Sequence, residues 1–173
     1  MLRMSGSLRN QPVLSLHSGT QIAVALEPII NPHNLKILGW WCKSPGNGQL
    51  VLLAENLREI DANGLIVNDV DELTAPEDLV RHREVLDIRF QLLDKPVKTK
   101  NQKLGKVSDY SYNDGLFVQK LYVVRSLIKV FSSEDTVIVD RTQILEVTDH
   151  HILVRDNEIH ATQEELSGAT APA

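Results

Sequence analysis

The sequence has little cysteine, no excess of positive charge and no long apolar run. Its 173 residues include a single cysteine, Cys42, which excludes an intramolecular disulfide and a multi-cysteine metal site and is consistent with a reducing cytosol. The longest apolar runs, such as residues 50–54, are too short to cross a bilayer, and residues 1–10 lack the apolar segment of a signal peptide. We therefore expect a soluble, cytoplasmic protein without a transmembrane segment.

Positive charge is in the minority. The chain carries 18 lysines and arginines against 23 acidic residues, which gives a net charge of −5. A general nucleic-acid-binding protein normally has a basic excess, so the composition argues against that class. A local basic patch remains compatible with this composition.

What the sequence does contain is an internal repeat. Residues 57–60 (LREI) and 64–69 (GLIVND) are matched, 87 residues further along, by residues 144–147 (ILEV) and 151–156 (HILVRD). Upstream, residues 8–13 pair with residues 92–97, and residues 37–42 with residues 118–123. A repeat of this length predicts two similar small domains.

Short runs of β-forming residues separated by turn residues dominate both halves. Strands are expected over residues 12–16, 22–30, 36–42, 50–54, 56–61 and 65–68, and then over 85–93, 106–112, 116–124, 136–140, 141–148 and 152–155. Asn63-Gly64 and Asp114-Gly115 supply the positive φ angles of tight hairpins. The buried register is expected at Leu65, Val67, Ile152 and Val154. This alternation suits small antiparallel barrels.

One helix is expected between the halves, over residues 75–87. Thr74 can cap it, Pro76 is tolerated in its first turn, and the acidic residues that follow favour its positive end. The predicted organisation is an N-terminal barrel over residues 1–74, a linker helix over 75–87, a C-terminal barrel over 88–160 and a disordered tail over 161–173. The tail is small and polar, with nothing to bury.

The second half resembles a PRC-barrel domain over about residues 90–160. The resemblance is carried by residues 104–109 (LGKVSD), the Asp114-Gly115 hairpin, residues 121–123 (LYV), and residues 144–147 (ILEV) before 152–156 (ILVRD). The first half is similar but divergent, because Gly105 has no clear counterpart and residues 22–28 stand in its place. PRC barrels are shared by the photosynthetic reaction-centre H subunit and the ribosome maturation factor of the small subunit. The resemblance implies a mainly β protein of two small antiparallel PRC-like barrels in tandem, which are non-catalytic and dock on other macromolecules.

Five lysines fall within twelve residues that contain no acid. They are Lys95, Lys98, Lys100, Lys103 and Lys106. If Val97 and Thr99 point inward on a strand, Lys98 and Lys100 share the opposite face. The cluster can contact RNA phosphates or an acidic protein surface. The alternative is a solvated edge strand that lysines guard against aggregation.

Trp40 and Trp41 are adjacent and therefore point to opposite faces of a strand. We expect Trp40 in the core and Trp41 outward, where Trp41 either anchors a partner or packs against the other barrel or the linker helix. Cys42 is expected to be a core residue, and the adjacent His150 and His151 to form a hairpin turn instead of a metal site. No catalytic, cofactor-binding or metal-binding residue is assigned.

Two functions of different classes follow from these features. The first is a non-catalytic adaptor or scaffold that binds a protein or ribonucleoprotein partner through the barrel surfaces, the lysine cluster and Trp41, with direct RNA contact as an option. The alternative is a small-ligand-binding protein or enzyme that uses the groove between the barrels, near which His17, His33 or His82 could lie. No cofactor is predicted.

Overall fold

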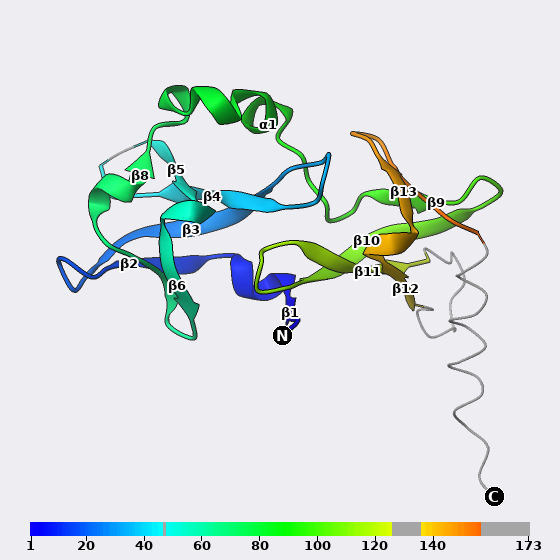
Figure 1. Ribbon diagram of the computed structural model, residues 1–173, viewed down its shortest axis with the longest axis horizontal. Coiled ribbons are helices and arrows are strands. Elements are labelled where there is room, and N and C mark those ends of the chain that lie inside the picture. The colour runs from blue at the N-terminus through cyan, green and yellow to red at the C-terminus, as the bar shows by residue number, and fades with distance from the viewer. Residues whose placement is uncertain (47, 126–135, 157–173) are drawn as a thin grey trace, which may run out of the picture. The chain divides into compact units, whose positions relative to one another are not determined.

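The computed structural model describes residues 1–46, 48–125 and 136–156 (Figure 1). It is mainly β, as predicted, with two curled sheets and one short α-helix. The chain divides into two compact units. The N-terminal unit is Ser5–Phe90, and the C-terminal unit combines Met1–Met4 with the chain from Gln91 onward. The predicted tail, residues 161–173, lies outside the described residues.

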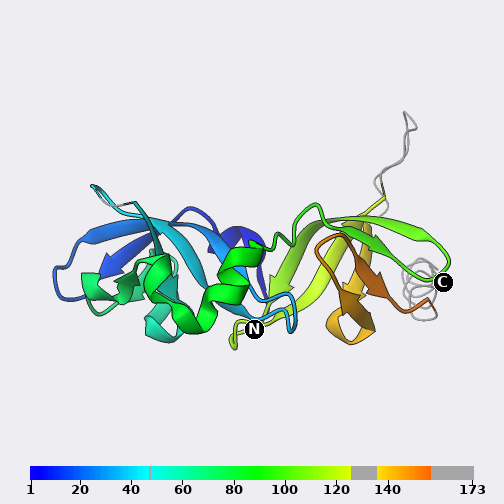
Figure 2. The same ribbon diagram turned by 90° about the horizontal axis from the view of Figure 1, so that it is seen from above.

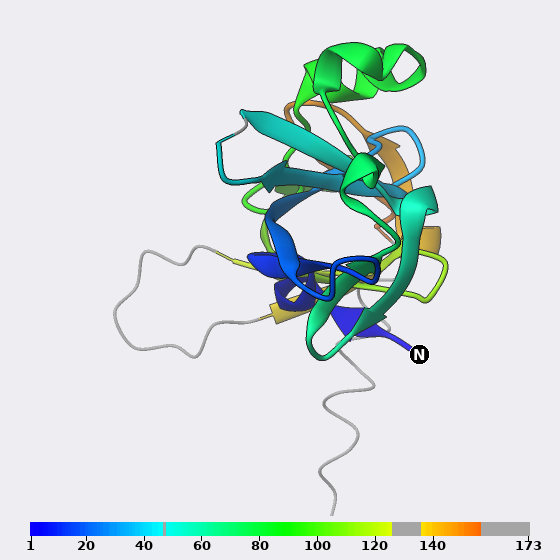
Figure 3. The same cartoon turned by 90° about the vertical axis from the view of Figure 1, so that its left-hand side faces the viewer.

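The N-terminal unit contains a seven-stranded sheet. Its strands are β2 (Gln11–Ser15), β3 (Gln21–Ile30), β4 (Ile37–Lys43), β5 (Gln49–Leu53), β6 (Leu57–Asp61), β7 (Gly64–Val67) and β8 (Leu73–Thr74). The spatial order is β6-β7-β2-β3-β4-β5-β8, and all pairs are antiparallel except β2 with β7. Figure 3 shows how these strands curl, which places one face of the sheet inside.

Helical turns are short throughout. They are η1 (Ser5–Leu8), η2 (Ala54–Asn56), η3 (Val70–Glu72), η4 (Pro76–Asp78), η5 (Val80–His82), α1 (Arg83–Ile88) and η6 (Arg141–Gln143). Where a single helix was expected over residues 75–87, the chain forms η4, η5 and α1 in succession (Figure 2). The strand expected over residues 85–93 was wrong, because α1 runs to Ile88 and ends at Arg89 in a left-handed conformation. Leu79, Val85 and Leu86 pack on the sheet residues Ile29 and Val51.

The C-terminal unit contains a second seven-stranded sheet. Its strands are β1 (Arg3–Met4), β9 (Pro96–Lys98), β10 (Lys103–Tyr112), β11 (Val118–Val124), β12 (Thr136–Asp140), β13 (Ile144–Val147) and β14 (Ile152–Val154). The main order is β12-β11-β10-β9-β14-β13, with β9 and β14 parallel and the other pairs antiparallel. The N-terminal strand β1 pairs with the end of β10.

Six strands of each sheet correspond in order, whereas β8 of the N-terminal unit and β1 of the C-terminal unit have no counterpart. In β2, Val13 lies beside Leu65, and in β9 Val97 lies beside Ile152, both in parallel pairs. The two units also break register at the same places. Each has bulges at four matching positions: Ile22 and Leu104, Leu26 and Ser108, Leu38 and Gln119, and Arg58 and Leu145. A bulge changes twist and direction locally, so sharing all four gives the sheets the same curvature.

The predicted buried register is confirmed. The side chains of Leu65, Val67, Ile152 and Val154 are fully buried, while their neighbours Ile66 and Leu153 are half-exposed. Each unit therefore has an inner apolar face made by alternate residues of its strands.

Within the described residues, no helix is long and apolar enough to span a membrane.

Candidate functional site

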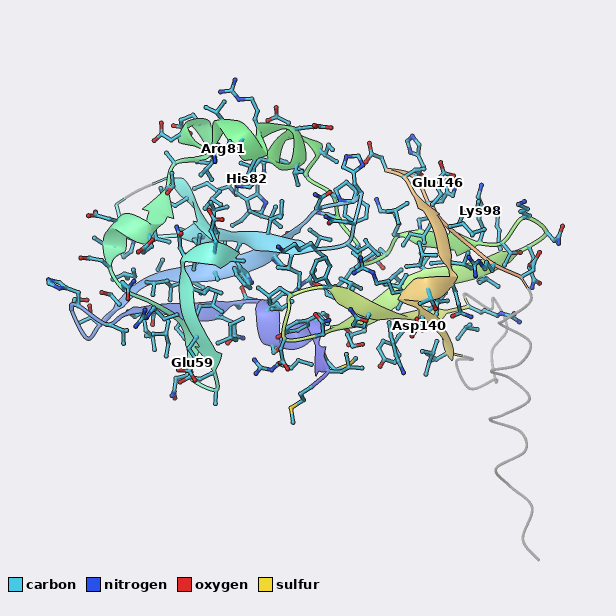
Figure 4. All side chains as sticks on the ribbon, in the orientation of Figure 1. Glu59, Arg81, His82, Lys98, Asp140 and Glu146 are labelled. Atoms are coloured by element: carbon cyan, nitrogen blue, oxygen red, sulfur yellow. The ribbon has the colours of Figure 1, made fainter. Side chains whose placement is uncertain are left out.

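The lysine cluster begins at Lys95, just before β9, and continues on β9 (Lys98), in the turn that follows (Lys100) and on β10 (Lys103 and Lys106). Strand β9 is not an edge strand, because β10 and β14 pair with it on its two sides. The reading of the cluster as a guarded sheet edge therefore does not hold for β9. The predicted orientation holds, since Val97 and Thr99 are buried while Lys98 is half-buried and Lys100 is exposed. Figure 4 labels Lys98 on its strand.

Three of the five lysines line one groove, together with an arginine that the sequence pattern did not indicate. This basic groove has a volume of about 560 Å³ and is lined by Pro96, Val97, Lys98, Lys103, Leu104, Gly105, Lys106, Arg125 and His151. Its described lining has four cations and no carboxylate. Lys98 lies opposite Lys103, and Lys106 lies opposite Val124, the residue before Arg125.

Among the described residues, these four cations have no anionic partner, and none of them takes part in an ion pair. The Nε atom of Arg125 is buried and has no hydrogen-bond partner among the described residues. Unpaired like charges gathered in one groove repel one another, and a bound anion would relieve that repulsion.

Gly105 is needed for the shape of the groove. Its φ of +146° lies in the region that favours glycine, and a Cβ there would collide with the carbonyl oxygen of Val124. The backbones of β10 and β11 therefore approach more closely at this point than any side chain permits. The equivalent residue in the N-terminal unit is Ala23, as the pairing of Val97 with Gly105 and of Val13 with Ala23 shows.

The N-terminal unit has a groove that overlaps the equivalent position, with five of its lining residues (Gln21, Ile22, Ala23, Val24 and Ser44) corresponding to lining residues of the basic groove. It also measures about 560 Å³ and is lined by Gln21, Ile22, Ala23, Val24, Leu26, Lys43, Ser44, Pro45 and Gly46. Strand pairing matches Lys103 to Gln21, Lys106 to Val24 and Arg125 to Ser44, while Lys98 matches Leu14. Lys43 is the one charged residue among its described lining residues. The same scaffold thus carries a basic groove in one unit and an apolar groove in the other.

The other two lysines of the cluster lie apart from the groove lining. Lys95 donates a hydrogen bond of 2.7 Å from Nζ to the carbonyl oxygen of Asp149. Lys100 lies at the tip of the hairpin, where the Thr99 hydroxyl accepts hydrogen bonds from the backbone N–H groups of Asn101 and Gln102. The cluster therefore divides into three lysines that line the groove and two, Lys95 and Lys100, that do not.

Trp41 packs within its own unit. Its ring is half-buried against a cluster that includes Val51 and Leu86, and the guanidinium carbon of Arg89 lies 4.7 Å from the ring centroid. This matches the packing of Trp41 against the helical segment, one of the alternatives that the sequence left open. Trp40 is fully buried, as expected.

Cys42 and the histidines were singled out by the sequence for possible chemistry. Cys42 is fully buried, and burial raises the pKa of its thiol to about 12 even though the backbone of Leu52 lowers it. His150 and His151 form a hairpin turn whose backbone N–H groups donate to the Thr148 hydroxyl. Among the described residues, no group of three or more His, Cys, Asp or Glu side chains could hold a metal ion.

The histidines proposed for a ligand cleft all belong to the N-terminal unit. His17 lies in the turn after β2, and His82 ends η5. His33 Nε2 is 3.7 Å from Glu84 Oε1, with both side chains largely exposed. An exposed pair of this kind contributes little to stability.

Comparison with known proteins gives no assignment for this chain. No protein-family model matches it, and no curated protein matches it.

Proposed function

We propose that this protein is a non-catalytic, cytoplasmic adaptor in which two PRC-like barrels in tandem dock on an anionic protein or ribonucleoprotein partner. The observation that carries the proposal is the basic groove of the C-terminal unit, with four cations and no carboxylate among its described lining residues. Such a surface attracts an anionic partner by complementary charge.

The internal repeat supports a binding role for these cations. The N-terminal unit has the same strand order and the same four bulges without the positive charges. The fold therefore does not require them. Side chains that a scaffold does not need, gathered at one concave place, are typical of a recognition site.

The resemblance to PRC barrels also favours a binding role. It implies a small barrel that works by docking on larger assemblies, and the pattern that carries it contains turns and apolar residues instead of reactive groups. A binding role for both units follows, with the charged one as the selective element.

The test uses a groove variant in which three cations are replaced by the N-terminal unit's own residues: Lys103→Gln, Lys106→Val and Arg125→Ser. Full-length tagged protein is recovered from cells at about 50 mM and about 200 mM salt, the range over which phosphate and acidic contacts weaken. The groove variant is expected to lose the partners that the wild type retains at low salt. The measurement is quantitative mass spectrometry with RNA sequencing of the recovered material.

The matched control variant removes three exposed cations from the N-terminal unit that lie outside its groove: Arg58→Gln, Arg81→Gln and Arg83→Gln. It changes the net charge by the same amount as the groove variant. Loss of partners in both variants would assign binding to overall charge, and equal recovery by the wild type and the groove variant would remove the groove from the proposal.

A further inference from the structure

We infer that the basic groove receives an extended acidic peptide segment of a protein partner, in which carboxylates flank one or two apolar residues. The inference rests on the proposed function and names the chemistry of the partner at that site.

The cations sit in two pairs at the two ends of the groove. Lys98 and Lys103 face each other across β9 and β10, whereas Lys106 lies opposite Val124, next to Arg125. Lys106 comes three positions after Lys103, but because of the bulge at Leu104 the two lie opposite Pro96 and Lys98, which are two positions apart on β9, or about 7 Å at the usual rise of a strand. Carboxylates two or three residues apart in an extended peptide come closest to this separation.

The middle of the groove is apolar. Between the charged ends Pro96 is exposed and Gly105 has no side chain, while Val97 and Leu104, each 1% exposed, lie beneath them and offer a ligand almost no surface of their own. A ligand with charge along its whole length would leave this section without complementary contacts. Apolar side chains between two acids would bury apolar surface there, which is the main non-directional source of affinity.

Two features favour a peptide over a nucleic acid. Single-stranded nucleic acids bind on several aromatic side chains on which successive bases stack, and the described lining has no Phe, Tyr or Trp and a single ring, that of His151. The net charge of −5 also repels a long polyanion, whereas a short acidic segment senses mainly the local groove.

The experiment selects ligands without assuming a sequence. Purified full-length protein is panned against a phage-displayed library of random decapeptides and, in parallel, against a pool of random 20-nucleotide RNA. We expect enrichment of peptides with Asp or Glu two or three positions apart around Leu, Ile or Val, and no retention of RNA above that of the groove variant. The most enriched peptide is then synthesised with a fluorescent label for titration by anisotropy.

The titrations compare the wild type with the groove and control variants. Exposed charge contacts contribute modestly each, so removing three is expected to weaken the peptide about tenfold or more, with little change in the control variant. Changing the acids of the peptide to amides should cost a similar factor. Circular dichroism checks folding, and the pair Lys98→Gln and Lys103→Gln replaces the groove variant if it is unstable.

The inference would be overturned by enriched peptides without acids, by RNA retained through the groove cations, or by equal affinity of the peptide for the wild type and the folded groove variant. An absence of any enriched peptide would also overturn it. If cellular partners still depend on the groove while the peptides fail, the proposed function stands and only the peptide assignment falls. If neither depends on the groove, both fall.

Discussion

The groove of the C-terminal unit and the groove of the N-terminal unit share their backbone and differ in their charge. In both units a bulge lies at the start of the long strand, at Leu104 in β10 and at Ile22 in β3. The residue after the bulge is Gly105 in β10 and Ala23 in β3. The lining then diverges, with lysine and arginine in one unit and glutamine, valine and serine in the other. The difference separates what the fold needs from what a ligand would need.

A second pair of equivalent positions lies at the ends of β12 and β5. Lys120 lies opposite Asp140 in the C-terminal unit, and Gly39 lies opposite Leu53 in the N-terminal unit, so Asp140 and Leu53 are equivalent. Leu53 is buried in the cluster beneath α1, whereas Asp140 caps η6. One scaffold position is thus stabilised by apolar packing in one unit and by hydrogen bonds in the other.

The largest effect is expected from placing a charge in either core. Val154→Asp should unfold the C-terminal unit, because an unpaired buried carboxylate costs several kcal/mol, comparable to the whole stability of a small domain. Val67→Asp is the equivalent change in the N-terminal unit. Amide hydrogen exchange measures whether each change unfolds only its own unit. Leu153→Asp is the control, since that side chain is half-exposed, and normal melting of Val154→Asp would show that the inward register is misassigned.

Leu53→Ala is expected to have the next largest effect. Leu53 is 7% exposed and packs with Ile29, Val51 and Leu86, so removing its side chain leaves a cavity and should cost about 2–5 kcal/mol. Urea unfolding followed by Trp fluorescence measures the loss, because Trp41 contacts the same cluster. A loss below about 1 kcal/mol would mean that the helical segment closes over the cavity.

Gly105→Ala should cost about 1–3 kcal/mol, because alanine is strained at this φ and its Cβ would meet the carbonyl oxygen of Val124. At the equivalent position of the other unit, Ala23, the matching test is the reverse substitution. Ala23→Gly removes a buried methyl group and loosens the unfolded chain, at a cost of about 1 kcal/mol. Thermal unfolding of the two variants compares the positions, and a stable Gly105→Ala protein would contradict the close approach of the strands.

Asp140→Ala should cost about 0.5–2 kcal/mol through loss of a helix cap. The Asp140 carboxylate accepts a hydrogen bond from the Thr142 backbone N–H at 3.0 Å, and the Asp140 backbone N–H donates to Gln143 Oε1 at 2.6 Å. The Thr142 N–H bond, with the Thr142 hydroxyl and Lys120 adding to it, lowers the pKa of Asp140. Because the folded pKa is lowered, the ionised Asp140 carboxylate stabilises the folded state above the ordinary Asp pKa of about 3.9. This stabilisation is lost progressively as the pH falls from there through the folded pKa. The difference between wild type and variant should therefore shrink below about pH 4, and a constant difference would contradict the assignment.

The repeat, the mainly β class and the inward register were readable from the sequence because they depend on local alternation. The placement of β9 was not, since its parallel partner β14 is far along the chain and no local pattern encodes that pairing. The alternation of Leu86, Ile88 and Phe90 favours a strand, whereas the chain is helical to Ile88, turns at Arg89 and buries Leu86 within α1 and Phe90 after it. Tertiary packing decided between the two periods.

The site was predictable only in part. Lysine spacing identified Lys98, Lys103 and Lys106, but Lys103 and Lys106 would lie on opposite faces of a regular strand. The bulge at Leu104 brings both to the groove, and a bulge leaves no reliable trace in a single sequence. Arg125 follows β11 as an isolated cation, so no charge pattern marked it.

The smallest predicted effect concerns the stability cost of the basic groove itself. Lys98 and Lys103 are directly opposite on β9 and β10, and like charges in that arrangement destabilise a sheet slightly. Lys103→Gln, which installs the residue found at Gln21, should therefore raise the free energy of unfolding by about 0.2–0.5 kcal/mol. Gln21→Lys is the reverse control, with no gain expected because its opposite residue is the uncharged Leu14. Urea midpoints at about 20 mM and 0.5 M salt provide the measurement, since screening should abolish the difference at high salt. A decrease in stability at low salt would mean that Lys103 is held by an anion of its own chain, and the groove would then be less available to a partner.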